Sequence, residues 1–142
     1  MVGEICSKPA ITISPTATVQ EAAYRMRSRQ VGALVVVNSS QTPVGVVTDR
    51  DVTVRVVAQG SDPASVRVGA LIRRKPTVIP EDAGILEATK LLSRRGVRRL
   101  PVVTKAGKLV GVLSLDDLLM LLGSELGHIA SIVAGELGRA RI

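Results

Sequence analysis

The chain has 142 residues, of which 46% are hydrophobic and 22% charged, and its formal net charge is +7. This length and composition are typical of about one ordered domain rather than of a disordered chain. One Cys excludes an internal disulfide and a Cys-based zinc site, one His excludes a two-histidine mechanism, and an aromatic content of 1% excludes a nucleic-acid platform of stacked rings.

Taken in chain order, the sequence predicts one series of elements twice. An extended segment at residues 11–13 precedes a helix, strands at residues 31–37 and 44–48, and a closing helix. The second series has an extended segment at 77–79, a helix, strands at 97–103 and 109–114, and a closing helix. The apolar positions of the two first helices recur at helical spacing: Val19, Ala22, Ala23 and Met26, then Ile85, Ala88, Leu91 and Leu92.

The two series form an internal repeat with an offset of 66 residues and no gap over residues 2–52. Val44-Gly45-Val46 falls on Val110-Gly111-Val112, and Asp51 falls on Asp117. Because each half alone is too short for a strong core, we expect an α/β (α+β) fold of two pseudo-symmetric β-α-β-β-α repeats packed through their sheets. The expected divisions are repeat 1 at residues 1–60, a connecting loop at 61–67 and repeat 2 at 68–123.

Residues 124–142 are predicted to form an extra C-terminal amphipathic helix, weakened by its glycines. The sequence leaves open whether this helix packs on its own body or on a partner subunit. His128 lies within it and is expected to pack or to face solvent rather than to bind a metal. The apolar residues at helical spacing are Leu126, Ile129, Ile132, Val133 and Leu137. We see no signal peptide and no run approaching the ~20 apolar residues of a bilayer span, so we expect a cytoplasmic protein with no membrane partner.

A family resemblance rests on three features. One is the duplicated order of elements. The second is the strand at residues 96–103, Gly-Val-Arg-Arg-Leu-Pro-Val-Val. The third is the run at residues 45–51, Gly-Val-Val-Thr-Asp-Arg-Asp, with its repeat at 111–117. Residues 2–123 thereby resemble a tandem pair of CBS domains, the Bateman module, as a stand-alone member. In the first half Leu34-Val35-Val36 replaces the Leu-Pro-Val of the second, which removes one fixed turn near its cleft.

The resemblance implies a non-catalytic regulatory module that binds an adenosine-containing ligand in clefts between the two repeats. AMP, ADP or ATP is the expected ligand class, with S-adenosylmethionine or NAD as alternatives, and no metal or catalytic cofactor is expected. The resemblance also implies a disc-like homodimer and a target protein on another chain. No Ser, His and Asp set in the sequence places a base beside a nucleophile, so we expect no enzyme.

Thr48 with Asp51, and Ser114 with Asp117, share the pattern of a hydroxyl followed three residues later by an acid. From the residues alone each pair is either a helix N-terminal cap or a ligand site. A helix N-terminus offers N–H groups to a phosphate, and a carboxylate accepts both hydroxyls of a ribose. The resemblance implies that Asp51 and Asp117 bind ribose and that Thr48 and Ser114 bind ribose or phosphate.

The resemblance also implies which residues line each cleft, because in this family the segment that opens one half closes over the site that ends the other. Cys6 is from its type alone a small buried hydrophobe. Site 1 is expected to contain Thr48, Asp51, Val46, Ile72, Lys75, Thr77, Val97 and Arg98. Site 2 is expected to contain Ser114, Asp117, Val112, Cys6, Ile11, Val31 and Gly32.

Arg98 and Arg99 begin an apolar strand and must point to opposite faces, so one of them can face a cleft. The resemblance implies that these arginines meet phosphates. It makes the Asp51 cleft the basic one, since small residues occupy the equivalent positions of the first half. Lys75 is a further candidate phosphate ligand, unless it is an exposed loop lysine.

Two other functions stay open. One is a ligand-free structural or interaction module whose clefts are closed by side chains. The other is a nucleic-acid-binding protein, because residues 67–108 contain eleven Lys or Arg against Glu81, Asp82 and Glu87, a balance of +8, while the rest of the chain sums to −1. That stretch is either an anion-binding surface or a solvated basic face.

Overall fold

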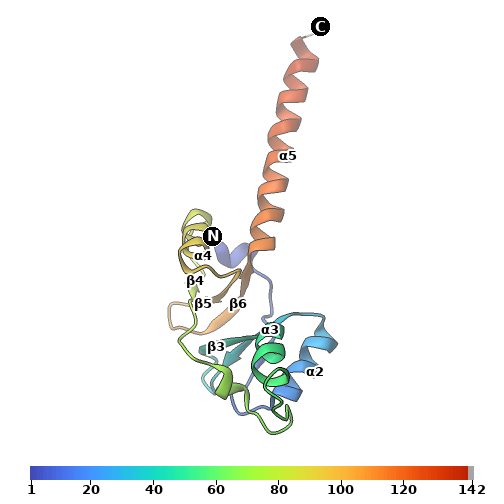
Figure 1. Ribbon diagram of the computed structural model, residues 1–142. Helices are drawn as coiled ribbons and strands as arrows, with labels where there is room; N and C mark the ends of the chain where they lie inside the picture. The colour runs from blue at the N-terminus through green and yellow to red at the C-terminus, as the bar shows by residue number, and fades with distance from the viewer. Residues whose placement is uncertain (141–142) are drawn as a thin grey trace.

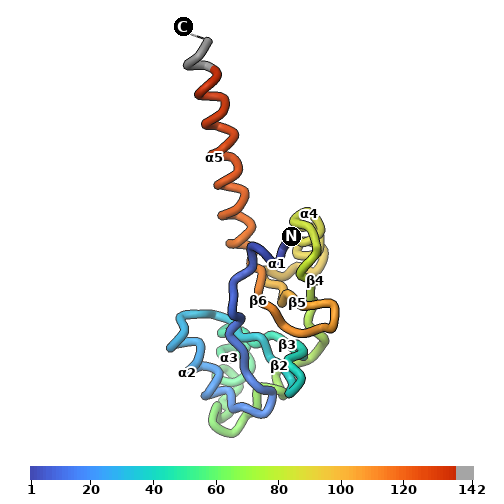
Figure 2. The backbone as a smooth tube through the Cα atoms, turned by 180° about the vertical axis from the view of Figure 1, so that it is seen from behind, coloured from blue at the N-terminus to red at the C-terminus, as the bar shows by residue number. Residues whose placement is uncertain are grey.

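The computed structural model describes residues 1–140, with side chains up to residue 136. Two three-stranded sheets form the two halves of the body, and one long helix projects from it (Figure 1). Seen from behind, the N-terminal segment runs from the half that holds the second sheet to the half that holds the first (Figure 2). This arrangement confirms the predicted mixed fold of two similar halves.

The first sheet has the order β1-β2-β3. Strand β1 (Thr12–Ile13) runs parallel to β2 (Ala33–Val37), and β2 pairs antiparallel with β3 (Pro43–Thr48). Helix α2 (Val19–Arg29) lies between β1 and β2 in the chain. Its N-terminus is capped by Thr18, whose hydroxyl accepts the Glu21 N–H at 3.1 Å.

The second sheet repeats this topology in the order β4-β5-β6. Strand β4 (Ile79–Pro80) is parallel to β5 (Arg99–Val103), which is antiparallel to β6 (Leu109–Ser114). Helix α4 (Ile85–Arg95) ends at Gly96, whose φ of 63° is the left-handed conformation that suits glycine. The register keeps the 66-residue offset: Val36 lies opposite Gly45, Val102 lies opposite Gly111, and both β2 and β5 have a bulge after these residues.

Each half is completed by the opening segment of the other. Helix α1 (Val2–Ile5) packs on the second sheet, where the Val2 N–H donates to the Ala83 carbonyl at 2.9 Å. The 3-10 helix η2 (Val68–Leu71) packs on the first half, where the Val68 N–H donates to the Ala17 carbonyl at 2.8 Å. Val2 and Val68 are fully buried in these opposite cores. Each hydrophobic core therefore contains residues from both sides of the loop at residues 61–67.

The two closing helices differ. In the first half α3 (Asp49–Val52) passes directly into a π-helical turn, η1 (Thr53–Val57). In the second half α5 (Leu115–Ala140) runs for 26 residues. The extra C-terminal helix expected from residue 124 is present, and it continues the closing helix of the second half, because α5 passes through Gly123 and Gly127 without a break. Glycine lowers the stability of a helix, but it ends the helix only where its backbone is left-handed. Neither Gly123 nor Gly127 has a positive φ.

Residues 122–136 of α5 do not pack on the body of the protein. Side chains of residues 122–136 are all exposed, which excludes the option that this segment packs on its own chain. His128 faces solvent. The side chain of Leu137, and Arg141 and Ile142 altogether, lie outside the described residues. By length and composition, with a mean hydropathy of 1.6, Leu115–Glu136 could cross a bilayer, so the expectation that no segment reaches this length is wrong.

Candidate functional site

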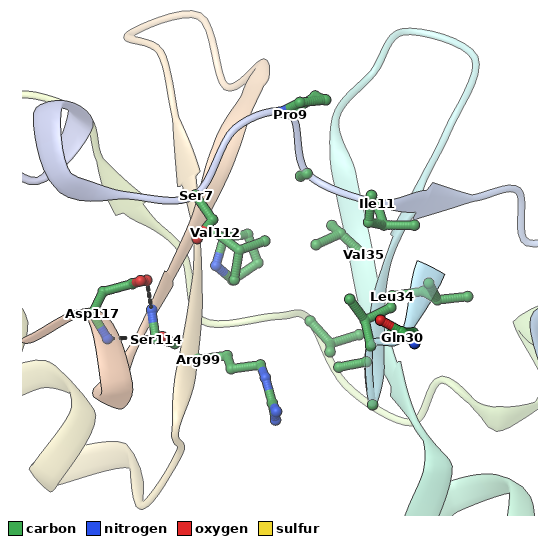
Figure 3. Close-up of a pocket in the computed structure, with 16 residues that line it drawn as sticks. Ser7, Pro9, Ile11, Gln30, Leu34, Val35, Arg99, Val112, Ser114 and Asp117 are labelled. Carbon is green, nitrogen blue, oxygen red and sulfur yellow. Dashed lines mark hydrogen bonds between the residues drawn. The ribbon is translucent and has the colours of Figure 1, made fainter. Parts of the chain in front are cut away.

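A cavity of about 290 Å³ lies between the two sheets. This volume is at the lower end of the range for small-molecule sites. The second half contributes the ends of β5 and β6 and the first turn of α5, while the first half contributes β2 and the segment before it (Figure 3). The residues that line it are Ser7, Pro9, Ala10, Ile11, Gln30, Val31, Gly32, Ala33, Leu34, Val35, Val46, Arg99, Pro101, Val112, Ser114 and Asp117.

Asp117 and Ser114 form the polar corner of this cavity. Asp117 Oδ2 accepts the Ser114 N–H at 2.8 Å, and the Asp117 N–H donates to Ser114 Oγ at 3.0 Å. This is a reciprocal helix cap that uses one carboxylate oxygen and leaves the other, Oδ1, without a hydrogen bond in the described part of the chain. The Ser114 hydroxyl proton likewise has no acceptor among the described residues. The corner therefore offers one anionic acceptor and one hydroxyl donor to a ligand.

Arg99 supplies the positive charge of the cavity. It is the first residue of β5 and the cross-strand partner of Ser114, so the hairpin register places the two side by side. Its guanidinium extends into the space between the halves (Figure 3). We expected the Asp51 cleft to be the basic one, but the structure places Arg99 in the cavity of Asp117. The sequence carried the signal, because pairing strands 97–103 and 109–114 as a hairpin sets Arg99 opposite Ser114.

The remaining walls are mostly apolar, with Ser7 and Gln30 as their polar residues. The segment before β1 crosses from one half to the other as a strap: the Ser7 N–H donates to the Val112 carbonyl at 2.9 Å, and the Val35 N–H donates to the Ile11 carbonyl at 3.0 Å. Between these two anchors Pro9 and Ala10 line the cavity. Such a strap bridges the two sheets, and its Pro9 and Ala10 give the slot between them an apolar wall.

Six of the seven residues predicted for site 2 lie together in this cavity. Cys6 is the exception: it is 8% exposed and packs in the core of the second half, and its Sγ lies 3.7 Å from the Gly3 carbonyl oxygen. Burial raises the pKa of this thiol, as expected for a small hydrophobe. The six are Ser114, Asp117, Val112, Ile11, Val31 and Gly32. Ser7, Pro9 and Ala10 lie in the segment from Cys6 to Ile11 that was expected to line this cleft, and the lining residues that sequence reasoning missed are Gln30, Ala33, Leu34, Val35 and Pro101.

The residues predicted for site 1 are arranged differently. Asp51 Oδ2 accepts both the Thr48 N–H at 2.9 Å and the Thr48 hydroxyl at 3.0 Å, so this hydroxyl proton is already used. Ile72 packs against Gly45 on β3, and a Cβ at Gly45 would lie 2.7 Å from Ile72 Cδ1. Val46 lines the Asp117 cavity instead. Lys75, Val97 and Arg98 are exposed and Thr77 is partly exposed, and none of these four lines that cavity.

Comparison with known proteins gives the family. The CBS domain model matches residues 2–58 and 68–124. An uncharacterized protein of Methanopyrus kandleri is 39% identical over 120 residues, which cover 84% of this chain and 61% of the relative. The CBS domain-containing protein YhcV of Bacillus subtilis is 40% identical over 111 residues, 75% of this chain and 74% of YhcV.

Among solved structures, a CBS domain protein from Pyrobaculum aerophilum complexed with AMP is similar to this chain, with a TM-score of 0.75 and 29% identity. The match covers 87% of this chain and 98% of that protein. The two matched segments are the two halves that the structure shows, each with its own sheet and its own hydroxyl–acid cap. The chain therefore belongs to the CBS domain family and carries two CBS domains in tandem.

Proposed function

We propose that the protein is a non-catalytic sensor that binds an adenine nucleotide in the Asp117 cavity. The observation that carries the proposal is the pairing of a half-free carboxylate with an arginine in a mostly apolar slot between two CBS domains. A relative of the same fold, at 29% identity, was solved with AMP. A slot lined by Ile11, Val35 and Val112 suits a purine, because apolar side chains hold a flat ring without aromatic partners.

Each polar group of the cavity has a role in this proposal. Asp117 Oδ1 accepts the ribose hydroxyls, since it is the carboxylate oxygen that the cap leaves free. Arg99 and the Ser114 hydroxyl meet the phosphate, because a guanidinium offers several donors to an oxyanion. The positive charge favours AMP, ADP or ATP over S-adenosylmethionine, whose sulfonium is itself cationic. NAD and S-adenosylmethionine remain as alternatives for the ligand screen.

We propose the Asp51 cleft as a second and weaker site. Its predicted ligands, Asp51, Thr48, Lys75 and Arg98, keep the roles that the family resemblance implies. The Thr48 hydroxyl must first leave Asp51 before it can donate to a ligand, whereas the Ser114 hydroxyl is free to donate. That difference makes the Asp117 cavity the tighter of the two.

We propose that a target protein on another chain responds to nucleotide binding. We also propose that the CBS pair acts as a homodimer and that both proteins are in the cytoplasm. A ligand shifts a protein between two states only if it binds one of them more tightly. Nucleotide bound between the sheets contacts both CBS domains and the strap that joins them, so it favours the separation of the sheets at which those contacts all form.

The test is nucleotide affinity in two matched variants, Asp117→Asn and Asp51→Asn. In Asp117→Asn the amide oxygen keeps the cap on the Ser114 N–H, which leaves an amide donor where the ribose hydroxyls need an acceptor. Losing a charged hydrogen bond costs about 1.5–3 kcal/mol, so AMP affinity by calorimetry should fall about 10–100-fold. Asp51→Asn makes the same chemical change in the other half and should leave the tighter site intact.

Two results would contradict the proposal. Equal AMP affinity in wild type and Asp117→Asn would remove Asp117 from the site, and a loss confined to Asp51→Asn would move the site to the other cleft. A thermal-shift screen with AMP, ADP, ATP, S-adenosylmethionine and NAD identifies the ligand, because saturation at 100 times Kd adds about 2.7 kcal/mol of stability. No shift with any of the five would favour a ligand-free interaction module.

A further inference from the structure

Helix α5 leaves the body of the protein after its first turns and carries a long apolar surface into solvent (Figures 1 and 2). Leu118 is 2% exposed and anchors the first turn in the core of the second half. From residue 122 to residue 136 every side chain is exposed. Apolar side chains in this number are not left in water without a partner that covers them, since a contiguous exposed apolar face marks an interaction site.

The apolar residues of α5 follow a seven-residue repeat. Leu119, Leu126 and Val133 form one series, and Leu115, Leu122 and Ile129 form the other, three or four residues away. The exposed fractions of Leu119, Leu126 and Val133 are 58%, 66% and 49%. In the second series the position seven residues after Ile129 is Glu136, so this series ends at Ile129. Two series offset in this way form a single stripe on a helix, the pattern by which helices pair side by side with interlocking side chains.

The composition of α5 argues that the helix is held by packing. Gly123 and Gly127 lie in its exposed part, and each weakens an isolated helix relative to alanine. Nothing lies within 4 Å of a Cβ placed at either glycine, so neither is there to accommodate a neighbour within this chain. A glycine-containing helix that makes no contact with its own body needs a partner to stay helical, because isolated helices are marginal in water.

Charge distinguishes a protein partner from a lipid surface. Between Leu115 and Glu136 there are four acidic side chains and no Lys or Arg. A helix that lies on an anionic membrane carries basic residues on its polar face, and α5 has the opposite charge. Asp117 in the first turn lines the cavity of the body, so a membrane that covered α5 from residue 118 onward would collide with the CBS pair.

We propose that α5 pairs with α5 of a second copy of this chain through the stripe formed by Leu115, Leu119, Leu122, Leu126, Ile129 and Val133. A seven-residue repeat is complementary to itself, and an isologous pair buries the same patch on both copies. Covering the exposed residues of this stripe on two copies, with Ile132 beside them, removes on the order of 1,000 Å² from water, the size at which specific interfaces begin. The pairing does not depend on the proposed nucleotide site.

The test is the mass of the full chain in solution, measured by light scattering after size exclusion. The double variant Ile129→Lys/Val133→Lys puts two charges in the stripe, and Ser124→Lys/Ser131→Lys puts the same charges on the other face of the same helix. We expect the stripe variant to have half the mass of the wild type and the control to keep the full mass.

A cross-linking experiment covers the case in which the lysine variants only unravel α5. Leu126→Cys lies in the stripe and should form a disulfide-linked dimer under mild oxidation, while Ser131→Cys on the other face should not. The native Cys6 does not interfere, since it is 8% exposed. Equal mass in the stripe variant and the wild type, or equal cross-linking at both cysteines, overturns the proposal, as does a wild type that floats with vesicles and is monomeric without them.

Discussion

Gly111→Ala tests whether the strap of residues 6–11 holds the cavity. Gly111 lies on β6 directly beneath this strap, and a Cβ at residue 111 would lie 2.5 Å from the Ser7 carbonyl oxygen and 2.9 Å from Cys6 Sγ. Real Cβ atoms do not approach a backbone oxygen so closely, so the strap must lift. Lifting it breaks the two bonds between Ser7 and Val112, whose N···O distances are 2.9 and 3.1 Å.

The cost follows from these contacts. Overpacking a well-filled site costs about 1–3 kcal/mol, and each backbone hydrogen bond contributes about 1 kcal/mol. We therefore expect Gly111→Ala to lower the free energy of unfolding by about 2–4 kcal/mol, a fall in Tm on the order of 10 °C for a chain of this size. AMP affinity should fall as well, because Ser7 and Pro9 of the lifted strap line the proposed site.

Gly45→Ala is the matched control, because Gly45 is the equivalent residue of the first sheet. Its added Cβ would meet the side chain of Ile72, with Cδ1 at 2.7 Å, rather than a backbone oxygen. A partly exposed isoleucine can change rotamer, so Gly45→Ala should destabilise the protein less and should change AMP affinity less. Thermal unfolding and calorimetry measure both effects. If the two alanine variants have the same stability and the same AMP affinity, the reasoning about the strap is wrong.

Three further predictions use other parts of the structure. Arg99→Met should weaken AMP binding about tenfold and leave adenosine binding nearly unchanged, because the charge-assisted bonds that it removes reach only the phosphate. Equal losses of AMP and adenosine affinity by calorimetry would show that Arg99 does not contact the phosphate. Thr18→Ala removes the cap on the Glu21 N–H and should cost about 1 kcal/mol in chemical unfolding, with no effect on nucleotide binding. Cys6 should resist iodoacetamide at neutral pH until the chain unfolds, because burial raises the pKa of its thiol, and rapid labelling of the folded protein would contradict the buried position.

Much of the fold is local and is therefore readable from the sequence. The hairpin of β2 and β3 and that of β5 and β6 follow from two apolar runs separated by a polar turn. The start of α2 follows from Thr18 and Glu21, and the end of α4 follows from Gly96. The offset of 66 residues then predicts the second half from the first.

The features that sequence reasoning missed depend on tertiary contacts or on competing signals. The assignment of Cys6 to the cavity was wrong because its side chain packs with α1 on the second sheet, a contact that no local pattern specifies. The unbroken α5 was missed because Gly123 and Gly127 weaken a helix, and nothing in a single sequence shows what holds the helix beyond them. We predicted that Arg99 binds phosphate but did not predict the cavity in which it lies, although the hairpin register pairs it with Ser114.

The asymmetry between the two clefts has a simple origin in the repeat. Ala33 lies opposite Thr48 in the first sheet, and Arg99 lies opposite Ser114 in the second. Two substitutions at equivalent positions therefore give one hydroxyl–acid pair a neighbouring positive charge and a free hydroxyl proton, and leave the other pair bonded to itself. The duplication gives two similar backbones, and the side chains at this strand pair decide which of the two clefts has a positive charge that favours an anion.

The proposed nucleotide site and the proposed helix pair share one element, because Asp117 lies in the first turn of α5. Leu118 fixes that turn to the core, while the side chains of residues 122–136 are exposed and do not pack on the body. A ligand that holds Asp117 therefore acts on the base of the helix whose far part pairs with the second copy. If the two events are coupled, linkage requires that AMP change the pairing constant by the same factor by which pairing changes AMP affinity. AMP affinity in the stripe variant and in its lysine control measures the second factor, and sedimentation measurements of pairing with and without AMP measure the first; two factors equal to one would show that the two sites are independent.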